Sequence, residues 1–149
     1  MKKFLQKKLK NEKGLTLVEL LAVIVILGII AAIAVPSIGN IIENSRVKAV
    51  KADAQTILSA ANMYFAENSE KSTVTLSELN TEKFIDDGGS FPITGTGTPT
   101  VTKSNSTKKA MTISGTGDNK GTKVVFTDAT SKEITDSGNS KAVPKSTTP

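Results

Sequence analysis

The 149-residue sequence contains no cysteine, no histidine and no tryptophan, and its aromatic side chains are one tyrosine and five phenylalanines. Without cysteine, neither a disulfide nor a thiolate metal site can form. The absence of histidine removes the commonest general base and the commonest metal ligand in proteins. So few aromatic rings leave little surface on which nucleic-acid bases could stack. These absences argue against an enzyme, and we expect no metal or other cofactor.

The net charge of +5 is concentrated at the amino terminus. Residues 1–14 contain six lysines and one glutamate, whereas acidic and basic side chains balance over the rest of the chain. Nucleic-acid recognition needs a basic patch, and none is evident outside this short segment. We therefore predict no specific nucleic-acid site.

Residues 20–42 form a long apolar run without a charged side chain. At about 1.5 Å per residue, a helix of this length extends roughly 34 Å, which is enough to cross the ~30 Å hydrocarbon core of a membrane. The lysines before the run predict a cytoplasmic amino terminus. The pattern is typical of a simple membrane anchor. It also fits a secretory signal peptide, because Ala32-Ile33-Ala34 matches a cleavage site that would leave Val35 as the first residue.

Glu19, at the start of the apolar segment, fits neither of these two interpretations. A carboxylate costs about 2.5–3.5 kcal/mol at the centre of a membrane and less near its edge, so it usually indicates a function and a partner. The nearest basic side chain, Lys13, lies on the far side of Gly14, and we expect no good partner for Glu19 within the chain. Cleavage after Gly14 would create an α-amino group on Leu15, four residues before Glu19 and on the same helix face.

The segment Gly14-Leu15-Thr16-Leu17-Val18-Glu19, followed by an apolar helix, resembles the amino terminus of type IV pilins and pilin-like proteins. The resemblance covers about residues 13–65. It implies that a prepilin peptidase cuts between Gly14 and Leu15 and that Leu15, which replaces the family's usual phenylalanine, is then N-methylated. It also implies that Glu19 pairs with the amino terminus of a neighbouring subunit during assembly.

Further expectations follow from the same resemblance. The stretch between Gly28 and Pro36 is expected to be a helix-break region that can lose helicity in the filament. The implied partners are other copies of the chain, the prepilin peptidase, an assembly platform protein, an assembly ATPase and, before assembly, membrane lipid. The protein would first span the cytoplasmic membrane once and then form an extracellular pilus. The lack of cysteine is compatible with a Gram-positive source.

Three functions remain open at this point. The first is a structural subunit of a type IV pilus that serves adhesion, motility or DNA uptake. The second is a pseudopilin or minor pilin of a secretion or competence apparatus. The third, from another class, is a membrane-anchored or secreted binding module.

The rest of the chain predicts an α+β fold, in which one long amino-terminal helix packs on a small antiparallel sheet. Apolar residues recur at steps of three and four between Val47 and Phe65, so we expect the helix to run from about Thr16 to Ala66 with one buried stripe. The candidate strands are residues 99–102, 110–114 and 123–127.

The predicted organisation has five parts: a cleaved leader at 1–14, an apolar transmembrane or filament-core helix at 15–42, an amphipathic helix at 43–67, a β-rich head at 68–134 and a flexible tail at 135–149. Within the head, Thr75 and Glu78 form a capping motif that starts a short helix. Residues 115–121 are expected to be a hairpin loop, because their glycines match no phosphate-binding fingerprint. The aspartates are too dispersed to predict a calcium site. Asn105 lies in an acceptor sequence for glycosylation.

Overall fold

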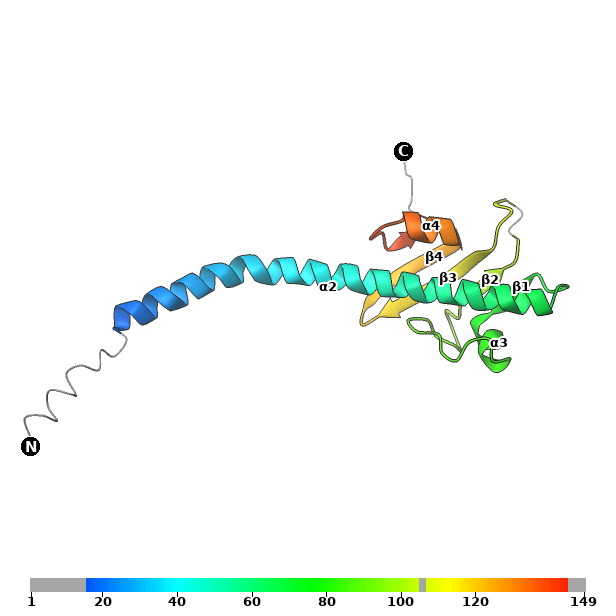
Figure 1. Ribbon diagram of the computed structural model, residues 1–149, viewed down its shortest axis with the longest axis horizontal. Helices are drawn as coiled ribbons and strands as arrows, with labels where there is room; N and C mark the ends of the chain where they lie inside the picture. Colours follow the sequence, from blue (N-terminus) through cyan, green and yellow to red (C-terminus); the bar gives the residue numbers. More distant parts are fainter. Residues whose placement is uncertain (1–15, 105–106, 145–149) are drawn as a thin grey trace, which may run out of the picture. The chain divides into compact units, whose positions relative to one another are not determined.

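The structure is a computed structural model, and it describes residues 16–104 and 107–144. It has the predicted α+β architecture (Figure 1). The elements in chain order are α2 (Leu17–Glu67), β1 (Thr73–Thr75), α3 (Leu76–Thr81), β2 (Thr100–Thr102), β3 (Thr112–Asn119), β4 (Thr122–Thr130), α4 (Ser131–Asp136) and β5 (Ala142–Val143). The chain divides into two compact units, residues 1–41 and 42–149, and α2 contains residues of both. We call the second unit the head.

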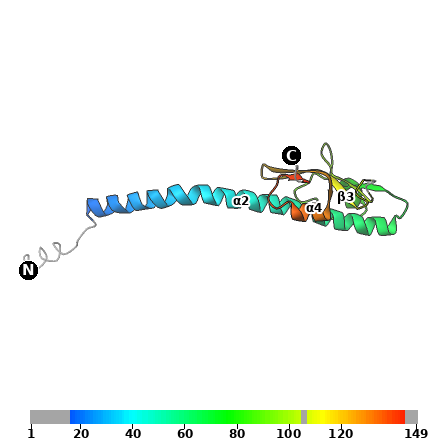
Figure 2. The same ribbon diagram turned by 90° about the horizontal axis from the view of Figure 1, so that it is seen from above.

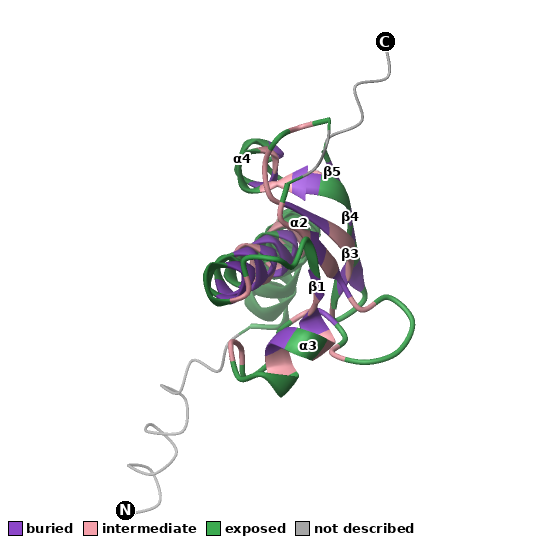
Figure 3. Ribbon diagram, turned by 90° about the vertical axis from the view of Figure 1, so that its right-hand side faces the viewer, coloured by how far each residue is buried: buried purple, intermediate pink, exposed green. Residues whose placement is uncertain are grey.

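The predicted long helix is confirmed, and its bounds differ from the expected ones by one residue at each end. In the head, α2 buries the predicted apolar stripe against the sheet (Figure 3). The buried side chains are Val47, Val50, Lys51, Ala54, Ile57, Leu58, Ala60, Ala61, Tyr64 and Phe65. Full burial of a large apolar side chain contributes about 1.5–3 kcal/mol to the stability of the fold. Packing of this stripe therefore holds the helix against the sheet.

The five strands form one sheet in the order β1-β2-β3-β4-β5, which lies along one side of α2 within the head (Figure 2). The first four strands are antiparallel, as predicted, whereas β5 pairs in parallel with β4. Val101 lies between Val74 and Ile113 in the register, and all three side chains are buried in the core. The alternating Thr-Val-Thr pattern of β1 and β2 thus places valine toward the helix and threonine away from it.

The turn between β3 and β4 is shorter than predicted. The strands pair as far as Asn119 and Thr122, so only Lys120 and Gly121 remain between them, at φ values of 50° and 86°. Two consecutive residues with positive φ define the tight hairpin turn that matches the twist of the strands. Gly117 lies inside β3, where a Cβ would be 2.4 Å from Val50 Cγ1. That glycine therefore lets α2 approach the sheet closely.

Two short helices begin with the same local motif. Thr75 and Glu78 form the predicted capping box at the start of α3. An equivalent box, formed by Thr130 and Glu133, begins α4. In each case the threonine hydroxyl accepts from a backbone N–H and the glutamate accepts from the backbone N–H of the threonine.

The predicted flexible tail at 135–149 is wrong for residues 135–144. Residues up to Asp136 continue α4, and Ala142–Val143 add a fifth strand, in which Val143 is buried. A sparsity of apolar residues suggested a tail, but one buried valine and several polar contacts are enough to hold the segment on the head. Residues 145–149 lie outside the described part of the chain.

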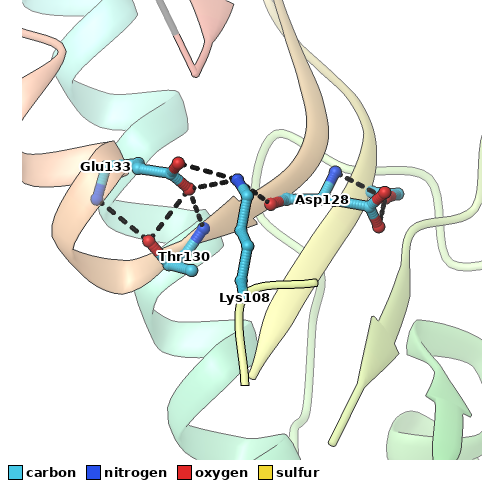
Figure 4. Close-up of polar contacts among 5 residues, drawn as sticks. Lys108, Asp128, Thr130 and Glu133 are labelled. Carbon is cyan, nitrogen blue, oxygen red and sulfur yellow. Dashed lines mark hydrogen bonds and ion pairs between the residues drawn. The ribbon is translucent and has the colours of Figure 1, made fainter. Parts of the chain in front are cut away.

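A separate group of polar contacts joins the start of α4 to the loop before β3 (Figure 4). The Lys108 ammonium donates to both oxygens of Glu133, at 2.6 and 2.7 Å, and to the Asp128 carbonyl oxygen at 2.7 Å. The Lys108 ammonium and the Thr130 backbone N–H both stabilise the ionised carboxylate, so the pKa of Glu133 lies below its usual value.

Candidate functional site

The first half of α2 carries large apolar side chains that are exposed in the structure. Leu17 is 85% exposed and Ile33 is 72% exposed, and the other large apolar residues of this half are between 46% and 74% exposed. By length and composition, α2 is the one described helix that could cross a membrane, with a mean hydropathy of 3.0 over its most apolar window. A signal sequence meets the same criterion. Hydropathy therefore does not distinguish a signal sequence from a membrane-spanning helix, and the polar groups at the start of α2 have to be considered.

At that start, Thr16 and Glu19 form a third capping box. The Thr16 backbone N–H and hydroxyl donate to Glu19 Oε2 at 2.8 and 3.0 Å, and the Glu19 backbone N–H donates back to the Thr16 hydroxyl oxygen at 3.2 Å. The expectation that Glu19 has no good partner within the chain is therefore wrong. The missed signal is the Thr-x-x-Glu spacing, which identifies the same motif at Thr75.

The cap leaves part of the Glu19 carboxylate available. Both bonds from Thr16 end on Oε2, and Oε1 accepts no hydrogen bond from any residue that the structure describes. A carboxylate has about four lone-pair sites on its two oxygens, so a second donor can bind without breaking the cap. Thr16 holds the side chain toward the beginning of the helix.

Gly14 and Leu15, the predicted cleavage site, lie outside the residues that the structure describes. Cleavage there and methylation of Leu15 remain predictions. The described chain begins at Thr16, whose capping bonds do not involve either residue.

Gly28 and Pro36, the predicted helix-break positions, both lie within the continuous helix α2. No atom beyond the local helix backbone lies within 4 Å of a Cβ placed at Gly28, so packing within the chain does not require glycine there. Proline lacks an N–H and weakens the helix locally. Loss of helicity between these two positions in a filament stays a prediction.

Charged residues that follow the apolar segment form an ion pair and a hydrogen bond with other residues of the head. Glu43 forms an ion pair with Lys141, and Arg46 donates to the Lys120 carbonyl oxygen at 3.3 Å. The hydrogen bond from Lys141 holds the pKa of Glu43 below its usual value. The change from apolar to charged side chains therefore coincides with the start of the packed unit at residue 42.

Comparison with known proteins yields two matches. Residues 9–35 match the family described as the prokaryotic N-terminal methylation motif. The chain is also similar to the type II secretion system core protein G of Pseudomonas aeruginosa, with 37% identity over 59 residues. That match covers 40% of this chain and 42% of the relative. No solved structure matches the chain.

The family match identifies the amino-terminal segment as a prepilin-type methylation motif. The segment is thus similar to the amino terminus of type IV pilin-like proteins, in agreement with the resemblance at Gly14 and Glu19. The chain spans less than half the length of the curated relative that it matches.

Proposed function

We propose that the protein is a prepilin that is processed after Gly14 and polymerises through its apolar helix into a surface filament. A prepilin peptidase would cut the leader and methylate Leu15, while lipid covers the apolar half of α2. An assembly platform protein and an ATPase would then move the subunit from the cytoplasmic membrane into the filament. Adhesion, motility and DNA uptake are the functions that such a filament could serve.

The observation that carries the proposal is the chemistry at the start of α2. The helix exposes its apolar side chains in the described part of the chain, and it begins with a carboxylate whose Oε1 accepts no hydrogen bond from a described residue. Processing after Gly14 would create a cation at the same depth. An isolated charge is costly to bury, and breaking a buried pair typically costs 3–5 kcal/mol, so pairing of the Leu15 amine with Glu19 of a neighbouring copy would favour the assembled state.

A set of three variants separates this pairing from the capping box. Glu19→Gln removes the charge but keeps a side chain that can complete the box, whereas Glu19→Ala removes both. Thr16→Ala weakens the cap by about 1 kcal/mol and keeps the charge. We expect all three proteins to insert into the membrane. Filaments sheared from the cell surface should be absent for both Glu19 variants and present, in reduced amount, for Thr16→Ala.

Normal filament yield from Glu19→Gln would contradict the pairing. Loss of filaments from Thr16→Ala together with normal assembly of Glu19→Gln would show that the carboxylate acts only as a cap.

The similarity to a type II secretion core protein favours a second candidate, a pseudopilin of a secretion apparatus. The same processing and pairing would apply, but the filament would be short and internal to the cell envelope. Electron microscopy of sheared surface material distinguishes the two. Abundant long filaments that contain this chain support a major pilin, and their absence despite processing supports a pseudopilin.

A further inference from the structure

Lys51 is a charged residue in the buried stripe of α2, where the helical pattern calls for an apolar side chain. Only 7% of its surface is exposed. Its ammonium group donates to Ser137 Oγ at 2.6 Å and to the Gly138 carbonyl oxygen at 2.9 Å. Burial disfavours the charged form and lowers the pKa of Lys51.

Within the described part of the chain, this ammonium group uses only some of its donors. A protonated lysine has three N–H donors, and two of those of Lys51 bind neutral acceptors among the described residues. None of the ion pairs found among the described residues includes Lys51. The carboxylates of α4 already have partners, since Glu133 binds Lys108 and Asp136 binds Lys132.

The acidic residue closest to Lys51 along α2 is also committed elsewhere. Asp53 Oδ2 accepts from the backbone N–H and the hydroxyl of Ser90, at 2.8 and 2.6 Å. The described part of the head therefore buries a cation without giving it a counter-charge. Such a group is costly unless an anion is supplied from outside.

A pocket of about 260 Å³ lies beside this cation, between α2 and α4. Lys51 and Lys48 provide its positive charge, and Ala52, Ile134 and Gly138 form much of its remaining wall. Gln55 also lines it, but its amide is engaged with Ser131 in both directions, at 2.9 and 2.7 Å. Lys48 is exposed and has no hydrogen bond or ion pair among the described residues. The volume is below the range of about 300–1,000 Å³ that drug-sized ligands occupy, so only a small group would fit.

We propose that this pocket binds a carboxylate group that carries a short aliphatic chain. The Lys51 ammonium would donate its third N–H to the carboxylate, Lys48 would add charge at the rim, and the apolar wall would cover the chain. The carboxylate could belong to a free short-chain acid or to an aspartate or glutamate of a second copy of this chain. The first source is independent of the proposed filament, and the second depends on it.

The alternative is that Lys51 only caps α4, whose own last turn contains no basic residue. Its two bonds to Ser137 and Gly138 would serve that purpose without any ligand. The two interpretations differ in one respect. A cap alone predicts no saturable response of Lys51 to an added carboxylate.

The test uses the full chain in detergent micelles and sodium acetate as the probe. Lysine side-chain NMR signals are followed while acetate replaces chloride at constant ionic strength. We expect the Lys51 signals to shift along a saturation curve, with a smaller shift at Lys48 and none at Lys83, an exposed lysine elsewhere on the head. Absence of a shift at Lys51, or a linear shift equal to that at Lys83, would overturn the proposal.

Two variants keep the test valid if substitution of Lys51 itself disrupts the fold. Lys48→Gln removes the charge at the rim and should weaken acetate binding several-fold, whereas the control Lys83→Gln should not. Ala52→Leu places a larger side chain in the pocket from an exposed position, without touching the bonds of Lys51, and should abolish the acetate shift. If both Lys48→Gln and Ala52→Leu respond to acetate as the wild type does, acetate binds outside this pocket and the proposal is contradicted.

A second arm identifies the source of the carboxylate. Filaments are assembled from two protein samples, one with 15N-labelled lysine and one with 13C-labelled aspartate and glutamate. A solid-state NMR contact between Lys51 Nζ and a side-chain carboxyl carbon would assign the carboxylate to a neighbouring copy. Acetate binding without such a contact assigns the pocket to a free acid. Failure to form filaments would count against the proposed function and leave the acetate result unaffected.

Discussion

At the scale of single residues, the Thr-x-x-Glu motif explains much of the local structure. It begins α2, α3 and α4, at residues 16–19, 75–78 and 130–133. Each box satisfies two backbone N–H groups that a helix terminus otherwise leaves without partners. In the box of α4 the glutamate also has a second partner, since Glu133 binds Lys108. In the box of α2, Glu19 Oε1 accepts no hydrogen bond from the residues that the structure describes.

The Glu133 carboxylate should make the stability of the head depend on pH. Because its pKa is lowered in the folded protein, its contribution is complete above the unfolded value of about 4.3 and is lost as pH falls through the folded value. Glu133→Gln should therefore be less stable than wild type at pH 7, and the difference should shrink below about pH 4.5.

Urea unfolding in detergent micelles measures this difference, with fluorescence of Tyr64, the single and buried tyrosine, as the signal. Glu67→Gln, at the exposed end of α2, is the control and should follow the wild-type pH profile. A difference between wild type and Glu133→Gln that is constant from pH 7 to pH 3 would rule out this role of the carboxylate.

Residue-level prediction from the sequence succeeded where the signal is local. The cap at Thr75 was predicted from its spacing to Glu78, and the same rule applies at Thr16 and Thr130, where it was not used. The partners of Lys51 could not be predicted, because they come from residues 86 and 87 positions away in the chain. No local pattern encodes a contact of that kind.

At the scale of elements, α2 and the sheet are held together by the stripe that the periodicity of three and four identified. Ile57 is fully buried in this stripe, whereas Met63, on the same helix, is 53% exposed. Ile57→Ala should destabilise the head by about 2–5 kcal/mol, because it removes apolar contacts and leaves a cavity. Met63→Ala should change stability by less than about 0.5 kcal/mol. Urea unfolding followed through Tyr64 compares the two, and equal effects would contradict the assignment of the stripe.

The close approach of α2 to β3 should make Gly117 intolerant of a side chain. A Cβ there would overlap Val50 Cγ1, so Gly117→Ala should destabilise the head by about 1–3 kcal/mol. The double variant Gly117→Ala with Val50→Ala removes the overlapping methyl. Its destabilisation should be clearly smaller than the sum of the two single effects. Additive effects would show that the two residues do not share the same space.

The elements that the sequence did not predict are short. β1 and β5 contain three and two residues, which is too few for an alternating pattern to be visible. Their positions depend on pairing with β2 and β4, which are distant in sequence. The longer strands β3 and β4 were predicted, but the glycines of β3 were assigned to a loop. Gly117 is instead a strand residue selected by its packing against α2.

At the scale of the whole molecule, the two units differ in what indicates their function: a sequence motif in the first unit and the folded structure in the head. In the first unit the long apolar helix was predictable from sequence, and the further predictions rest on a local pattern of a basic segment, a glycine, a glutamate and an apolar run within 42 residues. The family match covers the same region, at residues 9–35. For the head, the structure gives the fold and the pocket beside Lys51. The acetate and filament experiments on Lys51 test whether this pocket has a role in assembly.

The mature amino terminus tests the central claim most directly. Mass spectrometry of the amino-terminal peptide from cell-surface material should detect a chain that begins at Leu15 with a methylated α-amino group. A chain that begins at Val35 would indicate a secretory signal peptide and a secreted binding module. A chain that retains residues 1–14 would indicate a simple anchor. Either of the last two results would contradict the prepilin assignment of Gly14, Leu15 and Glu19.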